Sequence, residues 1–269
     1  MLRFSGVAVS HPGLVRPGNE DSGFLGPTCL LVADGVGGAA AGEVASATTA
    51  YVVAATVLAD PGTDPADLLR AGVLRAQEQV AHGVRRDPAR TGMATTLTAL
   101  ATDGSRFALA HVGDSRAYVF REGQLTRVTR DHTYVQHLVD EGSLAEDDVA
   151  SHPWRSLVLR SIDGTVGETA DIARITLEPG DRVLLASDGL TDLVSERTLE
   201  LLLERHDDDT AVEALLDAAR AAGGRDNVTC LLATVVEGPA VSADGALVGA
   251  VREPGNIVDA GAVRMPHSA

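Results

Sequence analysis

Two apolar segments of the chain each end at an aspartate that is followed by glycine. CLLVADGVGG spans Cys29–Gly38, and VLLASDGL spans Val183–Leu190. Both apolar runs have the length and composition of buried strands. A buried strand end does not tolerate a charge unless something compensates that charge. The pattern therefore predicts a compensating partner for Asp34 and for Asp188.

Composition places the chain among acidic globular proteins. It has 269 residues, 45% of them hydrophobic, and a formal net charge of −16. This length allows one large core or two small ones. The negative charge, together with the missing Lys/Arg cluster, argues against a nucleic acid or an anionic membrane surface as partner. Because no apolar stretch reaches bilayer length and no export signal is visible, we expect a cytoplasmic protein with no membrane span.

The expected strands and helices alternate without a clean repeat. Apolar patterning predicts strands over residues 2–10, 29–33, 95–102, 107–112, 116–121, 125–129, 171–177, 181–186 and 228–236. It predicts helices over residues 42–58, 65–84, 195–205 and 210–222. The strands between residues 95 and 129, joined by tight turns, indicate an antiparallel meander. Cys29 and Cys230 lie in two strands, so we expect buried reduced thiols, with a disulfide as the alternative.

Two segments depart from this pattern. Asp131–Gly164 is polar and helical, which indicates an excursion from the sheet, a flap. After Glu237 the chain turns to Gly, Ala, Pro and scattered charge. We therefore expect one folded domain over residues 1–236 and a flexible tail or linker over residues 237–269.

Acidic residues recur where strands end or begin. Asp34, Asp188 and Asp226 each have Gly or Asn beside them, and Asp114 occupies the tight turn of HVGDSR. Carboxylates at strand ends can converge, and Mg²⁺ and Mn²⁺ prefer carboxylate, carbonyl and water oxygens. Gly35 would let the main chain come close enough to supply a carbonyl. For a lone Asp-Gly pair an ordinary turn is the commoner explanation, and the copy at residues 243–245 follows no strand.

The segment LVRPGNEDS at residues 14–22 adds an arginine and two further acids. Arg16 has a planar fork of donors that suits a phosphate or a carboxylate. Glu20 and Asp21 shortly precede the strand that delivers Asp34. An arginine beside a cluster of acids suggests an anionic substrate brought to cations. An ordinary surface ion pair is the alternative for this segment alone.

Six motifs follow one another along the chain: VRPGNEDS, LVADGVGG, GMATTLTAL, HVGDSRAYVF, LLASDGLTD and GGRDNVT. Together they resemble the metal-dependent protein phosphatases, the type 2C serine/threonine phosphatases, and most closely their bacterial branch. The resemblance covers roughly Gly6–Val236. It implies an α+β fold, a four-layer α-β-β-α sandwich of two antiparallel sheets flanked by helices, with the flap near the metals. It also implies that residues 1–236 form the catalytic domain.

The implied reaction is hydrolysis of phosphoserine and phosphothreonine in proteins at a dinuclear Mn²⁺ or Mg²⁺ centre. In the resemblance, Asp34 would bridge two metal ions and the carbonyl of Gly35 would bind one of them. Asp188 and Asp226 would hold the other ion. Two such ions lower the pKa of a shared water, so no protein nucleophile is required.

The resemblance implies roles for the other motif residues as well. Arg16 would grip the phosphoryl oxygens. A third, weaker metal site would use Asp114 and Asp188, with Ser156 of the flap. The residues that would orient the metal ligands or their waters are Glu20, Asp21 and Asn227. The implied substrates are phosphorylated proteins, including a Ser/Thr kinase, and we expect a monomer.

Position 36 departs from many eukaryotic members of that family. They carry a histidine there, a candidate general acid, whereas this chain has Val36, as bacterial members often do. The source of the leaving-group proton therefore has to lie elsewhere. His132, His137 and His152 lie in or near the flap, where surface histidines are the simpler interpretation. A metal-bound water is the other candidate donor.

The acidic residues and the net charge also bear on alternative functions. A pseudophosphatase that only binds its partner would be expected to lack a metal ligand, but Asp34, Asp188 and Asp226 are all present. A calcium-binding structural domain would need a D-x-D-x-D-G loop, and the sequence contains none. A two-metal nuclease would bind a polyanionic substrate, which the net negative charge of the chain opposes. A phosphatase dedicated to one phosphoserine partner in a stress-response switch remains open beside a broad kinase-opposing enzyme.

Overall fold

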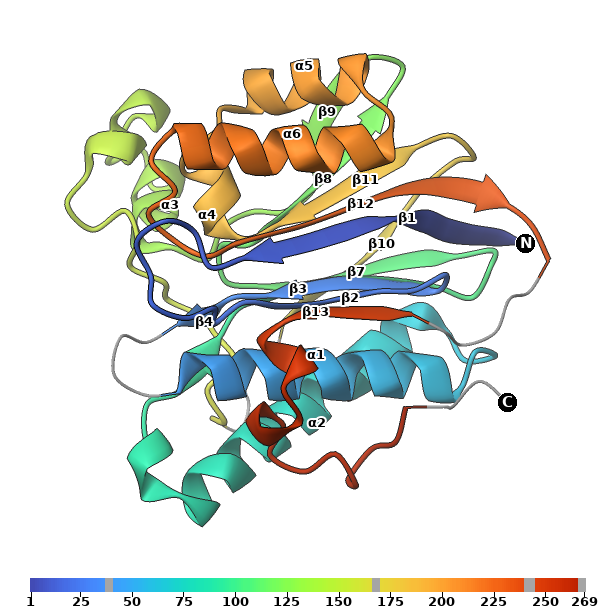
Figure 1. The fold of residues 1–269 in the computed structure, drawn as a ribbon, viewed down its shortest axis with the longest axis vertical. Coiled ribbons are helices and arrows are strands. Elements are labelled where there is room, and N and C mark those ends of the chain that lie inside the picture. Colours follow the sequence, from blue (N-terminus) through green and yellow to red (C-terminus); the bar gives the residue numbers. More distant parts are fainter. Residues whose placement is uncertain (37–40, 166–169, 240–244, 266–269) are drawn as a thin grey trace.

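Two antiparallel sheets pack face to face between two layers of helices (Figure 1). The computed structural model describes residues 1–36, 41–165, 170–239 and 245–265. Within these ranges the layer order is helix, sheet, sheet, helix, as the resemblance implied. The glycines at 37 and 38 of the first motif lie outside the described residues.

The first sheet has the strand order β1-β12-β11-β8-β9. Its strands are β1 (Leu2–His11), β8 (Arg116–Arg121), β9 (Gln124–Arg127), β11 (Arg182–Ala186) and β12 (Val228–Glu237). The helices over its outer face are α4 (Asp188–Thr191), α5 (Glu196–Arg205) and α6 (Asp208–Ala221). Leu199, Leu203 and Leu215 of these helices pack on Leu184 and Leu232 of the sheet.

The second sheet has the strand order β10-β7-β6-β3-β2-β13. Its strands are β2 (Ser22–Leu25), β3 (Cys29–Ala33), β6 (Leu97–Thr102), β7 (Phe107–Val112), β10 (Asp171–Ile175) and β13 (Ala246–Gly249). Helices α1 (Gly42–Ala59) and α2 (Pro65–Arg86) cover its outer face. Asp64 caps α2 by accepting a hydrogen bond from the amide of Ala66 (3.0 Å), and Pro65 fits the first helical position.

The remaining elements are short. β4 (Gly35–Val36) pairs with β5 (Ala94–Thr95) in a separate two-stranded sheet. The flap, residues 131–164, contains α3 (Tyr134–Asp140) and the 3₁₀ helix η2 (Glu146–Ser151). The other 3₁₀ helices are η1 (Pro88–Arg90), η3 (Ala250–Arg252) and η4 (Pro254–Asn256). The flap lies at the end of the sandwich where β12 begins and β11 leads into α4 (Figure 1).

The space between the two sheets is filled by apolar side chains from both. Phe4 and Leu231 come from the first sheet, and Leu30 and Leu100 come from the second. None of the four is more than 2% exposed. This inner core fixes how the strand ends of one sheet lie relative to those of the other.

Helix α1 combines the length and mean hydropathy of a membrane span with burial inside the domain. An 18-residue window over Gly42–Ala59 has a mean hydropathy of 1.3, and 83% of that window is buried in the fold. The expectation that no stretch reaches bilayer length is therefore wrong on length and composition. Because the helix packs against the second sheet and α2, its apolar residues serve the core.

The predicted meander between residues 95 and 129 is wrong in one respect. β6 and β7 pair in the second sheet, whereas β8 and β9 pair in the first. The turn at Gly113–Ser115 carries the chain from one sheet to the other instead of back along the same sheet. A tight turn with glycine has the same local sequence whether the next strand joins the same sheet or the other one. Only the packing of both strands on the inner core decides which sheet the second strand joins.

The segment after Glu237 is not a flexible tail in its described part. Ala246–Gly249 forms β13 at the edge of the second sheet, and Ala250 and Val251 are buried behind it. Composition suggested disorder because this segment is short of long apolar runs, but a sheet edge needs only a few main-chain hydrogen bonds to order a strand. Residues 240–244 and 266–269 lie outside the described residues.

Both cysteines are buried and unpaired. Cys29 in β3 and Cys230 in β12 have no exposed surface. Burial raises the pKa of each thiol to about 12. This confirms the prediction of buried reduced thiols, whose role is packing.

The face of β3 that α1 covers offers a direct stability test. Leu31→Ala should lower the free energy of unfolding by about 2–5 kcal/mol, because Leu31 is fully buried beneath α1 and the truncation leaves a cavity. Leu74→Ala on α2 is the control, since Leu74 is 47% exposed. Urea unfolding measures both variants. A loss at position 31 no larger than at position 74 would contradict the described core.

Candidate metal centre

Nearly all of the site residues proposed from sequence line one cavity of about 420 Å³. The cavity lies at the edge of the sandwich, beneath the flap. The proposed residues that line it are Arg16, Glu20, Asp34, Gly35, Asp114, Ser156, Asp188, Asp226 and Asn227. Asp21 is the exception, since it is fully buried behind the cavity wall. The structure thus brings together residues that are up to 211 positions apart in the sequence.

Asp34 is held in place through its main chain. It follows β3, and its carbonyl accepts hydrogen bonds from the amide of Thr96 (2.9 Å) and the hydroxyl of Thr95 (2.8 Å). Its amide donates to the hydroxyl of Thr96 (3.0 Å). At Gly35 a β-carbon would lie 2.6 Å from Gly42 and 2.8 Å from the carbonyl of Glu20, so only glycine fits. Asp34, held in this way, lines the cavity.

Asp188 and Asp21 are linked through Ser187. Asp188 opens α4 directly after β11. The hydroxyl of Ser187 donates to Oδ2 of Asp21 (2.8 Å), and the amide of Thr229 donates to the Ser187 hydroxyl (3.0 Å). This contact joins the loop before β2 in one sheet to strands β11 and β12 of the other. Ser187 was not predicted as a site residue, because the sequence shows it only as a small residue between the apolar run and Asp188.

Asp226 and Asn227 organise the loop that carries Arg16. A guanidinium nitrogen of Arg16, Nη2, lies 2.7 Å from Oδ2 of Asp226. Oδ1 of Asn227 accepts from the amide of Glu20 (2.7 Å), and its Nδ2 donates to the carbonyls of Pro12 and Gly18. Asn227 therefore fixes residues 12–20 against the start of β12. The Arg16 guanidinium is about half exposed at the mouth of the cavity.

Burial and mutual repulsion raise the pKa of these carboxyl groups. The pKa of Asp34 lies well above its ordinary value because of burial, reinforced by the charges of Asp21 and Asp188. Burial also raises the pKa of Asp188 well above its ordinary value. Among the neighbouring charges, that of Asp114 raises it most. Burial raises the pKa of Asp21 to about 6. A bound cation would relieve this excess of negative charge.

The donor set fits oxygen-loving divalent cations. Oδ1 of Asp21 is buried and has no hydrogen-bond partner among the described residues, which leaves an acceptor for a metal-bound group. Among those residues no group of three His, Cys, Asp or Glu side chains could by itself hold a metal ion, so carbonyl oxygens and waters would have to complete the ligands. Mg²⁺ and Mn²⁺ accept this arrangement, because they combine one or two carboxylates with carbonyl oxygens and retained waters.

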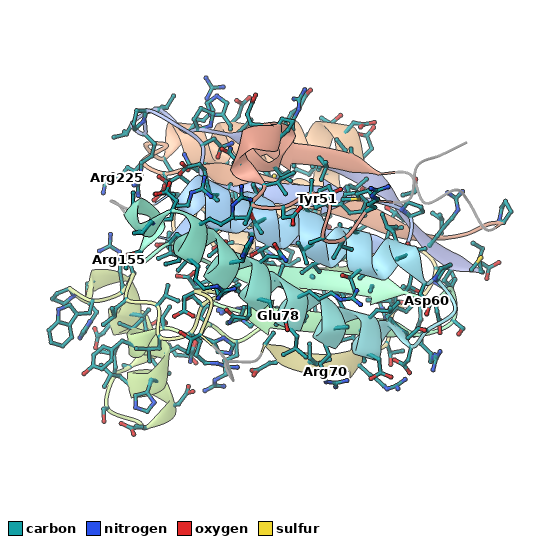
Figure 2. The ribbon with its side chains drawn as sticks, turned by 90° about the horizontal axis from the view of Figure 1, so that it is seen from below. Tyr51, Asp60, Arg70, Glu78, Arg155 and Arg225 are labelled. Carbon is teal, nitrogen blue, oxygen red and sulfur yellow. The ribbon has the colours of Figure 1, made fainter. Side chains whose placement is uncertain are left out.

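Asp114 lies between the main cavity and a second one of about 480 Å³ under the flap. The second cavity is also bordered by Arg155 of the flap and Asp192 after α4. Burial raises the pKa of Asp114 to about 7, with the charge of Asp131 the next contribution. Ser156 of the flap lines the main cavity, so the flap reaches the site. Figure 2 shows Arg155 at the end of the molecule where Arg225 precedes Asp226.

None of the described histidines lines the main cavity. His132 is mostly buried, where Nδ1 accepts from the amide of Gly113 (3.1 Å) and Nε2 lies 3.1 Å from Asp171. The interpretation of His132 as a surface histidine is therefore wrong, since it joins the flap to the turn that carries Asp114. His137 is about half exposed. The ring of His152 lies tilted against Tyr134 and edge-on to Trp154.

Comparison with known proteins adds independent findings to this geometry. A family model described as Protein phosphatase 2C matches residues 22–233. The chain belongs to the protein phosphatase 2C family. The serine/threonine phosphatase stp of Listeria welshimeri is 31% identical over 236 residues, which cover 82% of this chain and 91% of that protein.

The PstP phosphatase provides the comparison with a metal-bound structure. Serine/threonine protein phosphatase PstP of Mycobacterium tuberculosis is 43% identical over 237 residues, 88% of this chain. The chain spans about half of PstP, 46% of its length. A crystal structure of the PstP catalytic domain in complex with two manganese ions matches with a TM-score of 0.82 at 40% identity, covering 88% of this chain and 100% of that chain.

Charge neutralisation at Asp34 can be tested without substrate. Without metal, Asp34→Asn should raise the free energy of unfolding by about 1–3 kcal/mol at pH 7.5. The folded pKa of Asp34 exceeds its unfolded value, so the penalty for ionising it is absent below about pH 4 and grows as pH rises through the folded pKa. The gain should therefore shrink at pH 4.5. Urea unfolding at the two pH values measures it.

The same variant tests the cation. Excess Mn²⁺ should stabilise the wild type and leave Asp34→Asn nearly unchanged, because a ligand stabilises only the state that binds it. Asp147→Asn in the exposed helix η2 is the control and should respond to Mn²⁺ as the wild type does. Equal stabilisation of the wild type and Asp34→Asn by Mn²⁺ would contradict metal binding at Asp34.

Proposed function

We propose that this chain is a protein serine/threonine phosphatase that hydrolyses phosphoserine and phosphothreonine at a dinuclear Mn²⁺ or Mg²⁺ centre. The observation that carries the proposal is the convergence of Asp34, Asp188 and Asp226 with Arg16 in one cavity. The two manganese ions of the PstP catalytic domain and the phosphatase names of the relatives support it. Membership of the protein phosphatase 2C family supports the activity. The roles of individual residues are inferred from their positions in the cavity.

The acidic residues divide the binding of the cations between two sheets. Asp34 follows β3 of the second sheet and would hold cations together with the carbonyl of Gly35. Asp188 and Asp226 flank β11 and β12 of the first sheet and would hold them from that sheet. When bound, two divalent cations activate a water and neutralise charge on the phosphate ester. Asp21 and Glu20 orient the ligands from behind the cavity wall and from within it.

Arg16 binds the phosphate. Its guanidinium stands at the cavity mouth, and its fork of donors matches two phosphoryl oxygens. In the structure it pairs with Asp226, and the hydrogen bond to Asp226 raises the pKa of Arg16. The ion pair keeps the guanidinium directed toward the cavity before a substrate arrives. A phosphate near Asp226 would therefore meet a donor already in position.

Asp114 acts on the leaving-group side. It stands at the border between the two cavities, away from the hydrogen bonds that tie Asp21 to Ser187 and Asp226 to Arg16. With Val36 in place of a histidine, and no histidine among the described lining residues, another group has to deliver the proton to the alcohol. We assign Asp114, with Asp188 and Ser156, to a third metal position, where a bound cation would make a proton available on the leaving-group side.

The rim of the cavity suits a protein substrate. Leu14 and Val15, just before Arg16, are 57% and 67% exposed. Trp154 and Leu157, on either side of Ser156 in the flap, are 57% and 47% exposed. Exposed large apolar residues gathered near a catalytic cavity are typical of a surface that contacts a macromolecule. Phosphorylated proteins, a Ser/Thr kinase among them, are thus the substrates that we propose.

The setting of the enzyme is also part of the proposal. Buried reduced Cys29 and Cys230 and the absence of paired cysteines among the described residues are compatible with a cytoplasmic enzyme. A monomer remains our prediction. A phosphatase dedicated to one phosphoserine partner uses the same site, and phosphoproteomics of a deletion strain would separate it from a broad kinase-opposing enzyme.

Metal dependence and phosphate binding give the first activity test. Hydrolysis of an aryl phosphate should need Mn²⁺ or Mg²⁺ and stop in excess chelator. Arg16→Ala should lower kcat/KM by about 10²-fold while Mn²⁺ affinity, measured by calorimetry, stays within a few-fold, because the variant loses a donor to the phosphate and no metal ligand. Arg225→Ala is the matched control, since Arg225 is exposed nearby and does not line the cavity (Figure 2).

Two results would contradict this assignment. Full turnover in excess chelator would rule out the metal mechanism. Loss of Mn²⁺ affinity in Arg16→Ala, with the same affinity kept in Arg225→Ala, would make Arg16 a structural residue of the metal site.

The role of Asp114 predicts a loss that depends on the leaving group. Asp114→Ala should fold normally, bind two Mn²⁺ ions and lose more turnover on a phosphoserine peptide than on an activated aryl phosphate, because only the poor leaving group needs a proton. We expect the two losses to differ by about tenfold or more. Paired kinetics on the two substrates and a count of bound Mn²⁺ measure this. An equal loss on both substrates would reject proton delivery through Asp114.

A further inference from the structure

A segment near the C-terminus lies beyond the residues that the family model matches. That model ends at residue 233, whereas β13, η3 and η4 span Ala246–Asn256. Figure 1 shows this segment in red, running from the edge of the second sheet across α1. We call residues 246–258 the strap. Its contacts lead to the loop that carries Glu20 and Asp21.

The strap begins as the last strand of the second sheet. β13 pairs antiparallel with β2, with Ala246 opposite Leu25 and Gly249 opposite Ser22. β2 starts at Ser22, the residue after Asp21. The strap therefore covers the main-chain groups along the edge of β2, starting one residue from the metal centre.

The next residues of the strap bond directly to the Glu20–Ser22 loop. The amide of Ala250 donates to the carbonyl of Asp21 (2.7 Å). The amide of Val251 donates to the hydroxyl of Ser22 (3.1 Å), which lies 3.0 Å from the hydroxyl of Ser46 in α1. The Ser46 hydroxyl donates in turn to the carbonyl of Glu20. The strap therefore holds the carbonyl of Asp21 directly. It contacts the Ser46 hydroxyl, which holds the carbonyl of Glu20, only through Ser22.

The far end of the strap is anchored on the helices. The amide of Val258 donates to the hydroxyl of Thr48 in α1 (3.1 Å), and its carbonyl accepts from Nη1 of Arg86 in α2 (3.1 Å). The side chain of Asn256 donates to the carbonyl of Ala250 (3.0 Å), which braces the turn between η3 and η4. Val251 is 2% exposed. Beyond the strap, Ala260 and Met265 lie within hydrogen-bond distance of Tyr51, which Figure 2 labels on α1.

We propose that the strap is a positioning element for the metal centre, which it serves by fixing the main chain of Glu20 and Asp21. Asp21 Oδ2 meets Ser187 of the opposite sheet, and Glu20 faces the cavity, so the two peptide planes must keep their orientation. The strap touches neither cation nor substrate. Its catalytic consequence rests on the proposed function, whereas its effect on the Glu20–Ser22 loop does not.

Gly249 offers the sharpest substitution, because the strap meets Asp21 there most closely. Its φ is +77°, and a β-carbon would lie 2.2 Å from the carbonyl oxygen of Asp21 and 2.9 Å from the hydroxyl of Ser10. Gly249→Ala should push the strap away from Asp21. Gly180→Ala is the matched control, since Gly180 also has a positive φ, +94°, yet a β-carbon there meets nothing within 4 Å. Both variants carry the backbone strain, and only the first disturbs the contact.

Three measurements on the full chain decide the proposal. Amide hydrogen exchange at residues 21–24, followed without metal, should become at least tenfold faster in Gly249→Ala than in Gly180→Ala. Mn²⁺ affinity, measured by calorimetry, should fall at least tenfold in Gly249→Ala alone. At saturating Mn²⁺, the kcat of Gly249→Ala for an aryl phosphate should be much closer to that of Gly180→Ala than its Mn²⁺ affinity is. The reason is that the strap positions ligands and contacts no substrate. Thermal unfolding verifies that both variants are folded.

A second variant protects the test if Gly249→Ala fails to fold. Ala250→Pro removes the amide hydrogen that donates to Asp21 and puts a ring carbon in its place, and proline suits the first position of a 3₁₀ or α-helix. It should give the same faster exchange and weaker Mn²⁺ binding. If both strap variants matched Gly180→Ala in exchange and in Mn²⁺ affinity, the strap would only cover the sheet edge and the proposal would be overturned.

Failure of the proposed function would look different. A wild type that hydrolyses no phosphate ester with Mn²⁺ present would remove the phosphatase assignment. The difference in hydrogen exchange between Gly249→Ala and Gly180→Ala would still decide whether the strap positions the loop.

Discussion

The arrangement of the whole molecule depends on holding like charges together at one end of a sandwich. Asp21 is fully buried, Asp34 and Asp188 are partly buried where they line the cavity, and burial raises the pKa of all three. Left to themselves, such groups would take up protons or push the strand ends apart. The sheets keep them in place because pairing and core packing elsewhere in the strands outweigh that repulsion. The fold therefore keeps an excess of negative charge at this end of the sandwich. Binding cations would relieve the repulsion between these carboxylates.

Hydroxyl and amide side chains convert that repulsion into a defined geometry. Thr96 and Thr95 hold the main chain of Asp34, Ser187 holds the carboxylate of Asp21, and Asn227 holds the loop before β2. These groups carry no charge, so they add order without adding to the repulsion. They also work across the two sheets, which explains why they come from segments far apart in the sequence.

The acidic positions could be predicted from the sequence because each follows or precedes an apolar run that is long enough to recognise as a strand. The cavity then gathers these residues, and their individual roles remain predictions. β2 escaped prediction because it has only four residues, too few to display a period. β13 escaped for a related reason, since its order comes from hydrogen bonds to β2 and not from its own apolar content. The crossing between β7 and β8 depends on which sheet each strand joins, and that is decided by contacts between distant residues.

The inner core has a second function that follows from where the acids lie. Asp34 is attached to the second sheet and Asp188 to the first, so the separation of their carboxylates is set by side chains that never approach the cavity, such as Leu30 and Leu231. A close-packed interior transmits small shifts, because it has few voids in which to absorb them. In the proposed centre, two cations sharing Asp34 would tolerate only small changes in that separation. Packing between the sheets would then act on the proposed metal centre as well as its ligands do, and the strap would extend the same control to the loop that reaches the centre from the sheet edge.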